Sequence, residues 1–133
     1  MDENPVQEFL SKVTQWGIAS DNISAILLVG SHARGEARPD SDVDIVILAE
    51  IPGRYLDEQL WLERFGDPLR VSIEDWGLVK SLRVWYEGGL EVEFGFTSDA
   101  WLSIPMDAGT KNVLSDGFHL LVDKGNFSSK LHV

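Results

Sequence analysis

Apolar residues change their spacing several times along the chain, and each change marks an expected element. The first helix is expected to begin at Asn4-Pro5 and to end at Gly17, with one apolar face formed by Val6, Phe9, Leu10 and Val13. Continuous apolar runs then predict buried strands over residues 23–29 and 42–49, and residues 31–37 between them indicate a short helix or turn.

The second half of the chain favours strands. Gly88-Gly89 is expected to form a two-residue hairpin turn between two of them. A helix is expected over residues 54–65, followed by strands over 69–75, 79–86 and 90–96. A second helix over 107–116 and a last strand over 118–122 follow them. This order predicts an α/β (α+β) fold, a mixed β-sheet flanked by a few helices, as one domain over residues 1–125 with a flexible tail over 126–133.

Composition narrows the functional classes. The 133 residues include 22 Asp and Glu against 11 Lys and Arg, which gives a net charge of −11 and makes nucleic acid an unlikely partner. This charge suits a cationic substrate, a basic partner or metal-bridged phosphates. Because there is no cysteine, a disulfide scaffold, a thiolate zinc site and a cysteine nucleophile are excluded. The apolar runs are too short to span a bilayer, and the N-terminus is acidic. Both features predict a cytoplasmic protein that does not associate with membranes.

Two aspartates interrupt the second apolar strand. Asp42 and Asp44 are two residues apart, so on a strand they face the same side, roughly 7 Å from each other. Two such carboxylates repel each other and lose hydration, and a divalent cation relieves both costs. Ligands that are all oxygen favour Mg²⁺ or Mn²⁺.

A glycine and a hydroxyl follow the first strand directly. Gly30 allows a ligand to approach the backbone closely, and the Ser31 hydroxyl can donate to a phosphate oxygen. Arg34 and Arg38 on the same connection can neutralise a polyphosphate. The alternative for this segment is a plain turn in which Asp42 acts as a cap. Together, the residues predict a nucleotide and metal site.

The spacing of these residues resembles a known family. Gly30-Ser31, ten residues, and then Asp42-x-Asp44 are similar to the minimal nucleotidyltransferase branch of the DNA polymerase β-like nucleotidyltransferase superfamily. The resemblance implies that Gly-Ser holds a triphosphate, that both aspartates bind metal and that a later strand supplies a third carboxylate. Glu93 matches that third position, where the family usually has Asp, whereas Glu91 on the same strand face is expected to be a surface residue.

The resemblance also implies an activity. We expect Mg²⁺-dependent (or Mn²⁺-dependent) transfer of a nucleoside monophosphate, AMP from ATP, to a hydroxyl acceptor, with Asp42, Asp44 and Glu93 as catalytic and metal-binding residues. In this branch the acceptor partner is a small HEPN-type toxin, and a homo-oligomer is the other expected assembly. Two alternatives are an aminoglycoside or lincosamide nucleotidyltransferase and a non-catalytic nucleotide- or protein-binding module. The sequence does not identify which aromatic residue, if any, stacks on the base.

Overall fold

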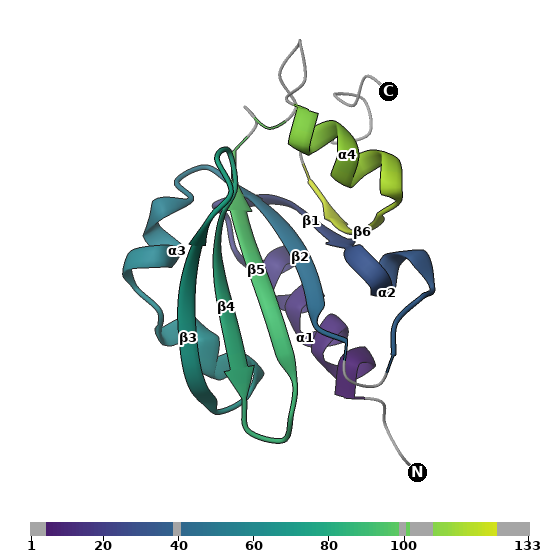
Figure 1. Cartoon of the computed structure of the whole chain (residues 1–133). Helices are drawn as coiled ribbons and strands as arrows, with labels where there is room; N and C mark the ends of the chain where they lie inside the picture. Colours follow the sequence, from purple (N-terminus) through teal and green to yellow (C-terminus); the bar gives the residue numbers. More distant parts are fainter. Residues whose placement is uncertain (1–4, 39–40, 99–100, 102–107, 125–133) are drawn as a thin grey trace.

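A single six-stranded sheet organises the molecule (Figure 1). A computed structural model describes residues 5–38, 41–98, 101 and 108–124. The helical elements are α1 (Pro5–Ala19), α2 (Gly30–Arg34), α3 (Gly53–Asp57), the 3-10 helix η1 (Leu60–Phe65) and α4 (Ala108–Asp116). The strands are β1 (Ile23–Val29), β2 (Val43–Ala49), β3 (Pro68–Asp75), β4 (Lys80–Tyr86), β5 (Glu91–Thr97) and β6 (His119–Asp123).

The strands lie in the order β3-β4-β5-β2-β1-β6. β2 and β5 run parallel, while the other neighbouring pairs are antiparallel, so the expected mixed sheet is confirmed. The parallel pair lies at the centre, and both of its strands carry apolar side chains toward the same helices. This arrangement places two distant segments of the chain, 43–49 and 91–97, side by side.

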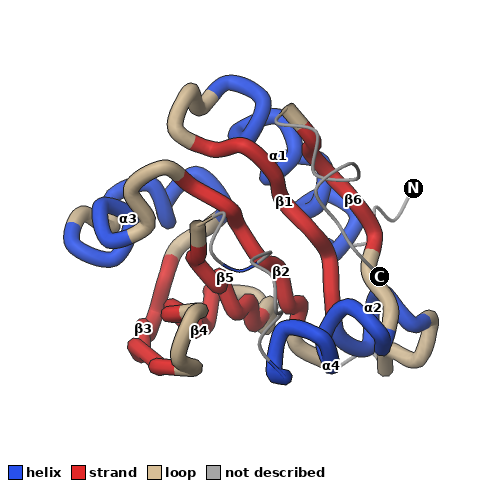
Figure 2. Tube along the Cα trace, turned by 90° about the horizontal axis from the view of Figure 1, so that it is seen from above, coloured by secondary structure: helices blue, strands red, loops and turns tan. Residues whose placement is uncertain are grey.

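Helices cover the two faces of the sheet unequally. α1, α3 and η1 pack on one face (Figure 2), where an aromatic cluster forms around Trp16 and Trp61, whose stacked ring centroids are 5.1 Å apart. On the opposite face, Trp101 and Leu114 of α4 pack over the β1 and β2 side of the sheet. The part of this second face formed by β3, β4 and β5 carries polar side chains instead.

Two expected helix boundaries are wrong. Gly17 does not end α1, which continues to Ala19. A Cβ on Gly17 would lie 2.5 Å from Cδ1 of Ile26, so the glycine allows the helix to approach the sheet closely. The helix expected over residues 54–65 is divided into α3 and η1 at Glu58, whose backbone is extended and whose carboxylate accepts a hydrogen bond from the Leu60 amide.

The hairpin between β4 and β5 also differs from its prediction. Its loop holds three residues, Glu87 to Gly89, because the Tyr86 amide donates to the Leu90 carbonyl oxygen at 2.8 Å. Gly88 and Gly89 both have φ near +95°, a conformation that favours glycine. The extra loop residue changes the register of the strand pair by one, which decides which side chains share a face.

The edge strand β3 exposes its apolar residues. Leu69 is 67% exposed and Ile73 is 63% exposed, although they point toward the face that the helices cover elsewhere. Among the described residues, no helix is long and apolar enough to cross a bilayer. The expected cap at Asn4 and the expected tail over 126–133 lie outside the described residues.

A buried hydrogen bond ties the sheet to η1 and allows a stability test. The Tyr86 hydroxyl donates to the Leu62 carbonyl oxygen at 2.8 Å, and both residues are buried. We expect Tyr86→Phe to lower the free energy of unfolding by about 1 kcal/mol, because the Leu62 carbonyl loses its partner. Leu60→Ala, at a residue that is 71% exposed, is the control and should cost less than about 0.5 kcal/mol. Urea denaturation measures both; equal effects would contradict the assigned role of this bond.

Candidate active site

The register of three strands places the main polar side chains in one row. Asp44 on β2 is the Cα partner of Glu93 on β5, and Glu93 is in turn the partner of Arg83 on β4. All three lie on the face opposite α1, and Asp42 stands one residue before β2. The structure therefore brings together the three carboxylates that the sequence predicted, Asp42, Asp44 and Glu93.

The backbone at position 30 passes so close to Asp44 that only glycine fits there. It begins α2 with φ +74°, and a Cβ at this position would collide with Oδ2 of Asp44. The contact follows from β1 pairing with β2, because Val29 is the Cα partner of Asp44. Ser31 is the next residue and is partly buried. The glycine and the aspartate of the motif are thus direct neighbours in space.

Arg83 is the centre of an ionic cluster. Its guanidinium donates to four carboxylates, with N···O distances of 3.0 Å to Asp42, 2.8 Å to Glu74, 2.7 Å to Glu91 and 3.2 Å to Glu93. One cation therefore compensates four anions from three segments of the chain, which are β3, β5 and the residue before β2. Hydrogen bonding to Glu74 is the largest reason that the pKa of Arg83 lies above its ordinary value, so this charge is permanent.

Asp44 lacks such compensation. Its Oδ1 atom is buried and has no hydrogen-bond partner. Burial, followed by the charges of Asp42 and Glu93, raises the pKa of Asp44 to about 8. Burial also raises the pKa of Glu93, whereas hydrogen bonding to Arg83 lowers that of Glu74. An unpartnered, desolvated carboxylate oxygen beside two further carboxylates is a donor set that suits a hard divalent cation.

The carboxylates are not arranged as a complete set of metal ligands. Within the described part of the chain, no group of three or more His, Asp or Glu side chains is arranged to hold an ion. Arg83 holds Asp42 and Glu93 on one side, while Asp44 lies against Gly30 on the other. These oxygens have the right chemistry for a metal, and Arg83 supplies the positive charge at their outer side.

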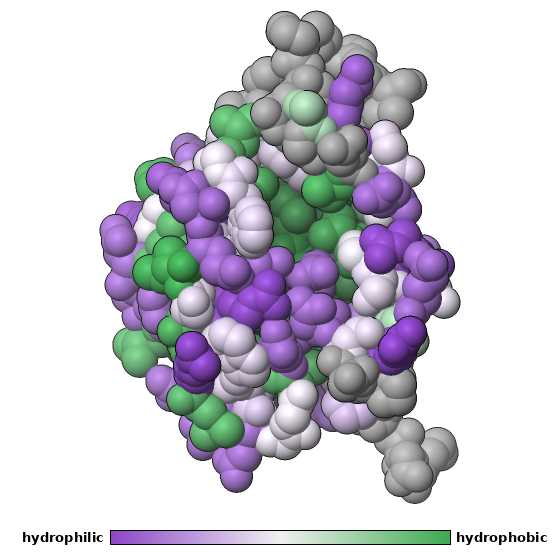
Figure 3. All heavy atoms as spheres, in the orientation of Figure 1, coloured by the Kyte–Doolittle hydropathy of each residue, from purple (hydrophilic) through white to green (hydrophobic). Residues whose placement is uncertain are grey.

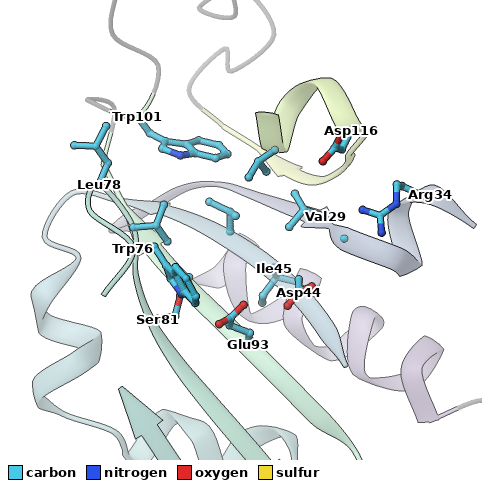
Figure 4. Close-up of a pocket in the computed structure, with 15 residues that line it drawn as sticks. Val29, Arg34, Asp44, Ile45, Trp76, Leu78, Ser81, Glu93, Trp101 and Asp116 are labelled. Atoms are coloured by element: carbon cyan, nitrogen blue, oxygen red, sulfur yellow. The ribbon is translucent and has the colours of Figure 1, made fainter. Parts of the chain in front are cut away.

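A cavity of about 400 Å³ opens beside this row. Its lining has a polar end and a largely apolar end, both over the same face of the sheet (Figure 4). Gly30, Arg34, Asp44 and Glu93 line the polar end, and Asp116 of α4 lies above them. The lining of the other end is largely apolar and comprises Trp76, Leu78, Val79, Trp101 and Val113. In Figure 3, hydrophilic surface (purple) crosses the middle of this face, and hydrophobic surface (green) is visible in the hollow above it.

Most of the predicted site residues meet at this cavity, but the prediction was incomplete. Arg34 lines it and is bound to Glu36 at 2.7 Å, whereas Arg38 is exposed and does not line it. Arg83 and Trp76 were missed. The alternation of Leu82, Arg83 and Val84 carried a signal, because a lone arginine between two buried residues faces the polar side of a strand.

The comparisons with known proteins agree with this geometry. A family model described as a nucleotidyltransferase domain matches residues 9–99, which include β1, α2, β2 and β5 and hence the whole carboxylate row. The chain belongs to the nucleotidyltransferase domain family. This assignment confirms the resemblance drawn from the sequence, and the family is one of transferase enzymes.

A solved structure shows the same fold. The crystal structure of an aminoglycoside 6-adenyltransferase from Bacillus subtilis matches 95% of this chain with a TM-score of 0.66 and 15% sequence identity. The chain spans 43% of that protein. No curated protein sequence shows significant similarity to the chain. At this identity the structural likeness concerns the fold alone, which confirms the expected polymerase β-like α/β fold.

The raised pKa of Asp44 generates a pH prediction for the metal-free protein. Folded Asp44, with its pKa raised to about 8, keeps its proton until the pH nears that value, whereas the unfolded chain releases the proton near the ordinary aspartate pKa of 3.8. The folded state therefore binds more protons between these values, and its stability falls as pH rises through this window. We expect Asp44→Asn to flatten this fall, measured by urea denaturation at pH 5 and pH 8 in EDTA. Asp57→Asn, at an exposed helix residue, is the control, and an unchanged slope in Asp44→Asn would contradict the assignment.

Removing Arg83 tests the ionic cluster. We expect Arg83→Met to destabilise the protein by about 1–3 kcal/mol, because four carboxylates lose their shared, partly buried cation. Arg70→Met is the matched control on the neighbouring strand, since Arg70 lies 4.8 Å from the Trp85 ring centroid and should cost only about 0.5 kcal/mol. Lowering the pH to 4 should narrow the difference as carboxylates become protonated. Equal losses in the two variants, measured by thermal unfolding, would show that Arg83 does not stabilise this cluster.

Proposed function

We propose that the protein is a Mg²⁺-dependent (or Mn²⁺-dependent) nucleotidyltransferase that transfers AMP from ATP to a hydroxyl acceptor. The observation that carries this proposal is the row of Asp42, Asp44 and Glu93 beside Gly30. A buried carboxylate with an unpartnered oxygen is costly, and it is retained here next to a cavity large enough for part of a nucleotide. The family assignment makes nucleotidyl transfer the chemistry that best explains this cost.

The metal would be held by Asp42, Asp44 and Glu93. When bound, it supplies positive charge to the phosphate oxygens and to the attacking oxygen. Asp44 must be ionised to act as a ligand, and its raised pKa means that binding releases a proton near neutral pH. Arg83 is not itself a ligand, but it donates to two of these three carboxylates, Asp42 and Glu93, as well as to Glu74 and Glu91.

The remaining steps follow from the positions of the side chains. Gly30 and Ser31 allow the triphosphate to approach the backbone at the start of α2, and Arg34 offsets its charge. Glu93 accepts the proton of the acceptor hydroxyl. The acceptor oxygen then forms a bond to the α-phosphorus as the bond to pyrophosphate breaks. Most of the catalysis consists of positioning and charge neutralisation, as in other phosphate transfers.

Two acceptor classes have support from different observations. A small cationic acceptor, such as an aminoglycoside, is supported by the net charge of −11 and by the structural neighbour, which is an aminoglycoside 6-adenyltransferase. A partner protein of the HEPN type, or a second copy of the chain, is supported by the exposed apolar residues of β3, including Leu69 and Ile73. In the second case the transfer would modify the partner, as expected for a toxin-antitoxin pair.

Labelled ATP distinguishes nucleotidyl transfer from other uses of ATP. We expect ATP labelled at the α-phosphate to label an acceptor in a cell extract, whereas ATP labelled at the γ-phosphate leaves it unlabelled. Glu93→Gln should keep MgATP binding within about threefold and reduce transfer at least a hundredfold, because the proton acceptor is lost. Asp42→Asn combined with Asp44→Asn should abolish MgATP binding.

Glu91→Gln is the matched control for Glu93→Gln, since both glutamates lie on β5 and contact Arg83. It should leave transfer nearly unchanged. Transfer that survives in Glu93→Gln but fails in Glu91→Gln would show that the wrong glutamate was assigned. A small labelled protein band would support the partner protein, and a labelled aminoglycoside would support the small acceptor. MgATP binding without any labelled product would favour a non-catalytic binding module.

A further inference from the structure

The order of the strands gives the two ends of the cavity different functions, provided that the proposed function holds. The phosphate-binding residues Gly30 and Arg34 follow β1, and the carboxylate row continues across β2 and β5 toward β4. In phosphoryl transfer the attacking and leaving oxygens lie roughly in line with the phosphorus. If pyrophosphate leaves at the Gly30 end, the acceptor must approach from the opposite end, over β4 and the β3–β4 hairpin.

Gly95 lines the cavity at this opposite end. It lies on β5, two residues after Glu93, between its strand partners Ser81 and Val46. A Cβ on Gly95 would lie 2.8 Å from Cγ1 of Val79, so the glycine allows the Val79 side chain to pack against β5. Val79 and Ser81 line the cavity next to Glu93, so a ligand that enters there lies beside this carboxylate.

Trp76 forms the outer wall of this space. It belongs to the β3–β4 hairpin and is 62% exposed, yet it lines the cavity together with Ser81 and Glu93 (Figure 4). The turn that carries it is fixed by two hydrogen bonds, from the Trp76 amide to the Val79 carbonyl oxygen at 2.8 Å and from the Gly77 amide to the Asp75 carboxylate at 2.9 Å. A large aromatic side chain on an ordered turn gains contact area when a ring covers it, at little further cost in conformational entropy.

The surroundings of Trp76 favour a positively charged ring. Glu74 lies two residues before it on β3, within the cluster in which four carboxylates surround only one arginine. The whole chain carries a net charge of −11, which attracts cations over a longer range. An ammonium group beside an indole face also gains a cation–π interaction.

We propose that Trp76 is an acceptor-binding residue, and that the acceptor is a hydroxylated ring that carries at least one amine and packs its face against the indole. The ring then lies in the part of the cavity lined by Val79 and Ser81, and its hydroxyl is directed toward Glu93. The nucleoside extends from the phosphorus in a third direction and packs against Trp101 and Val113. On this assignment Trp76, which lies outside the phosphate-binding motif, determines which acceptor binds.

Indole NMR signals test this assignment with kanamycin as the probe. The ¹⁵N-labelled protein is first saturated with Mg²⁺ and α,β-methylene-ATP, and the Trp76 signal is identified by its loss in Trp76→Phe. Added kanamycin should shift the Trp76 signal, while the Trp85 signal, whose ring packs against Arg70, stays in place. Trp76→Ala should weaken kanamycin binding about three- to tenfold, and Trp76→Phe should restore most of the affinity.

Two controls separate the ring, the charge and the nucleotide. Ile73→Ala removes another exposed apolar residue of β3 that does not line the cavity, and it should leave kanamycin affinity unchanged. Maltotriose, a neutral oligosaccharide, should bind at least tenfold more weakly than kanamycin. Trp76→Ala should bind the ATP analogue as well as the wild type does.

The outcomes distinguish this inference from the proposed function. The acceptor assignment is overturned if the wild type does not bind kanamycin, or if Trp76→Ala binds it with unchanged affinity. Normal binding of the ATP analogue in the same samples leaves the proposed function intact. Equal affinity for maltotriose overturns the requirement for an amine. Loss of analogue binding in Trp76→Ala alone assigns the residue to the nucleotide and contradicts the proposal. A wild-type protein that does not bind the analogue with Mg²⁺ overturns the proposed function itself.

Discussion

Electrostatic repulsion among carboxylates on one sheet face is the constraint on which the site depends. Five acidic side chains, Asp42, Asp44, Glu74, Glu91 and Glu93, meet around the ends of three strands and one connection, and Arg83 compensates four of them. Burial makes the fifth, Asp44, the most costly to ionise. A fold selected for stability alone would replace it. Its position beside a cavity is the physical argument for the metal and phosphate site proposed on this face.

The motif spacing has a direct structural cause. Antiparallel pairing of β1 with β2 sets Val29 beside Asp44, so the next residue, Gly30, must pass the carboxylate without a side chain of its own. The ten residues between Ser31 and Asp42 allow a short helix and a return to the sheet. Parallel pairing of β2 with β5 then brings Glu93 to Asp44 from a segment almost fifty residues away. The sheet thus assembles the site before any ligand contributes.

Local patterns predicted the elements of this fold well, and they predicted its register poorly. The apolar run of β1 and the Asp42-x-Asp44 spacing were sufficient because each depends on neighbouring residues. The predicted hairpin is wrong by one residue, because a two-residue turn at Gly88-Gly89 would pair Arg83 with Phe94, on the buried face. The observed three-residue loop pairs Arg83 with Glu93 instead. Trp76 could not be predicted, because its proposed role depends on the cavity that it lines together with Ser81 of β4 and Glu93 of β5.

The same register also bears on Glu93, which is proposed as the third carboxylate at a position where the resemblance to the family implies an aspartate. A glutamate has one more rotatable bond, so it reaches farther from β5 but is less well fixed. Arg83 restores that order, because its Nη2 lies 3.2 Å from Oε1 of Glu93 and its other nitrogens are held by Glu74 and Glu91. A guanidinium tied at several points holds its partner in one place more firmly than a single ion pair does. Glutamate at this position and arginine opposite it are therefore best understood as one unit, in which the longer side chain and its fixed counter-ion together take the place of a short aspartate.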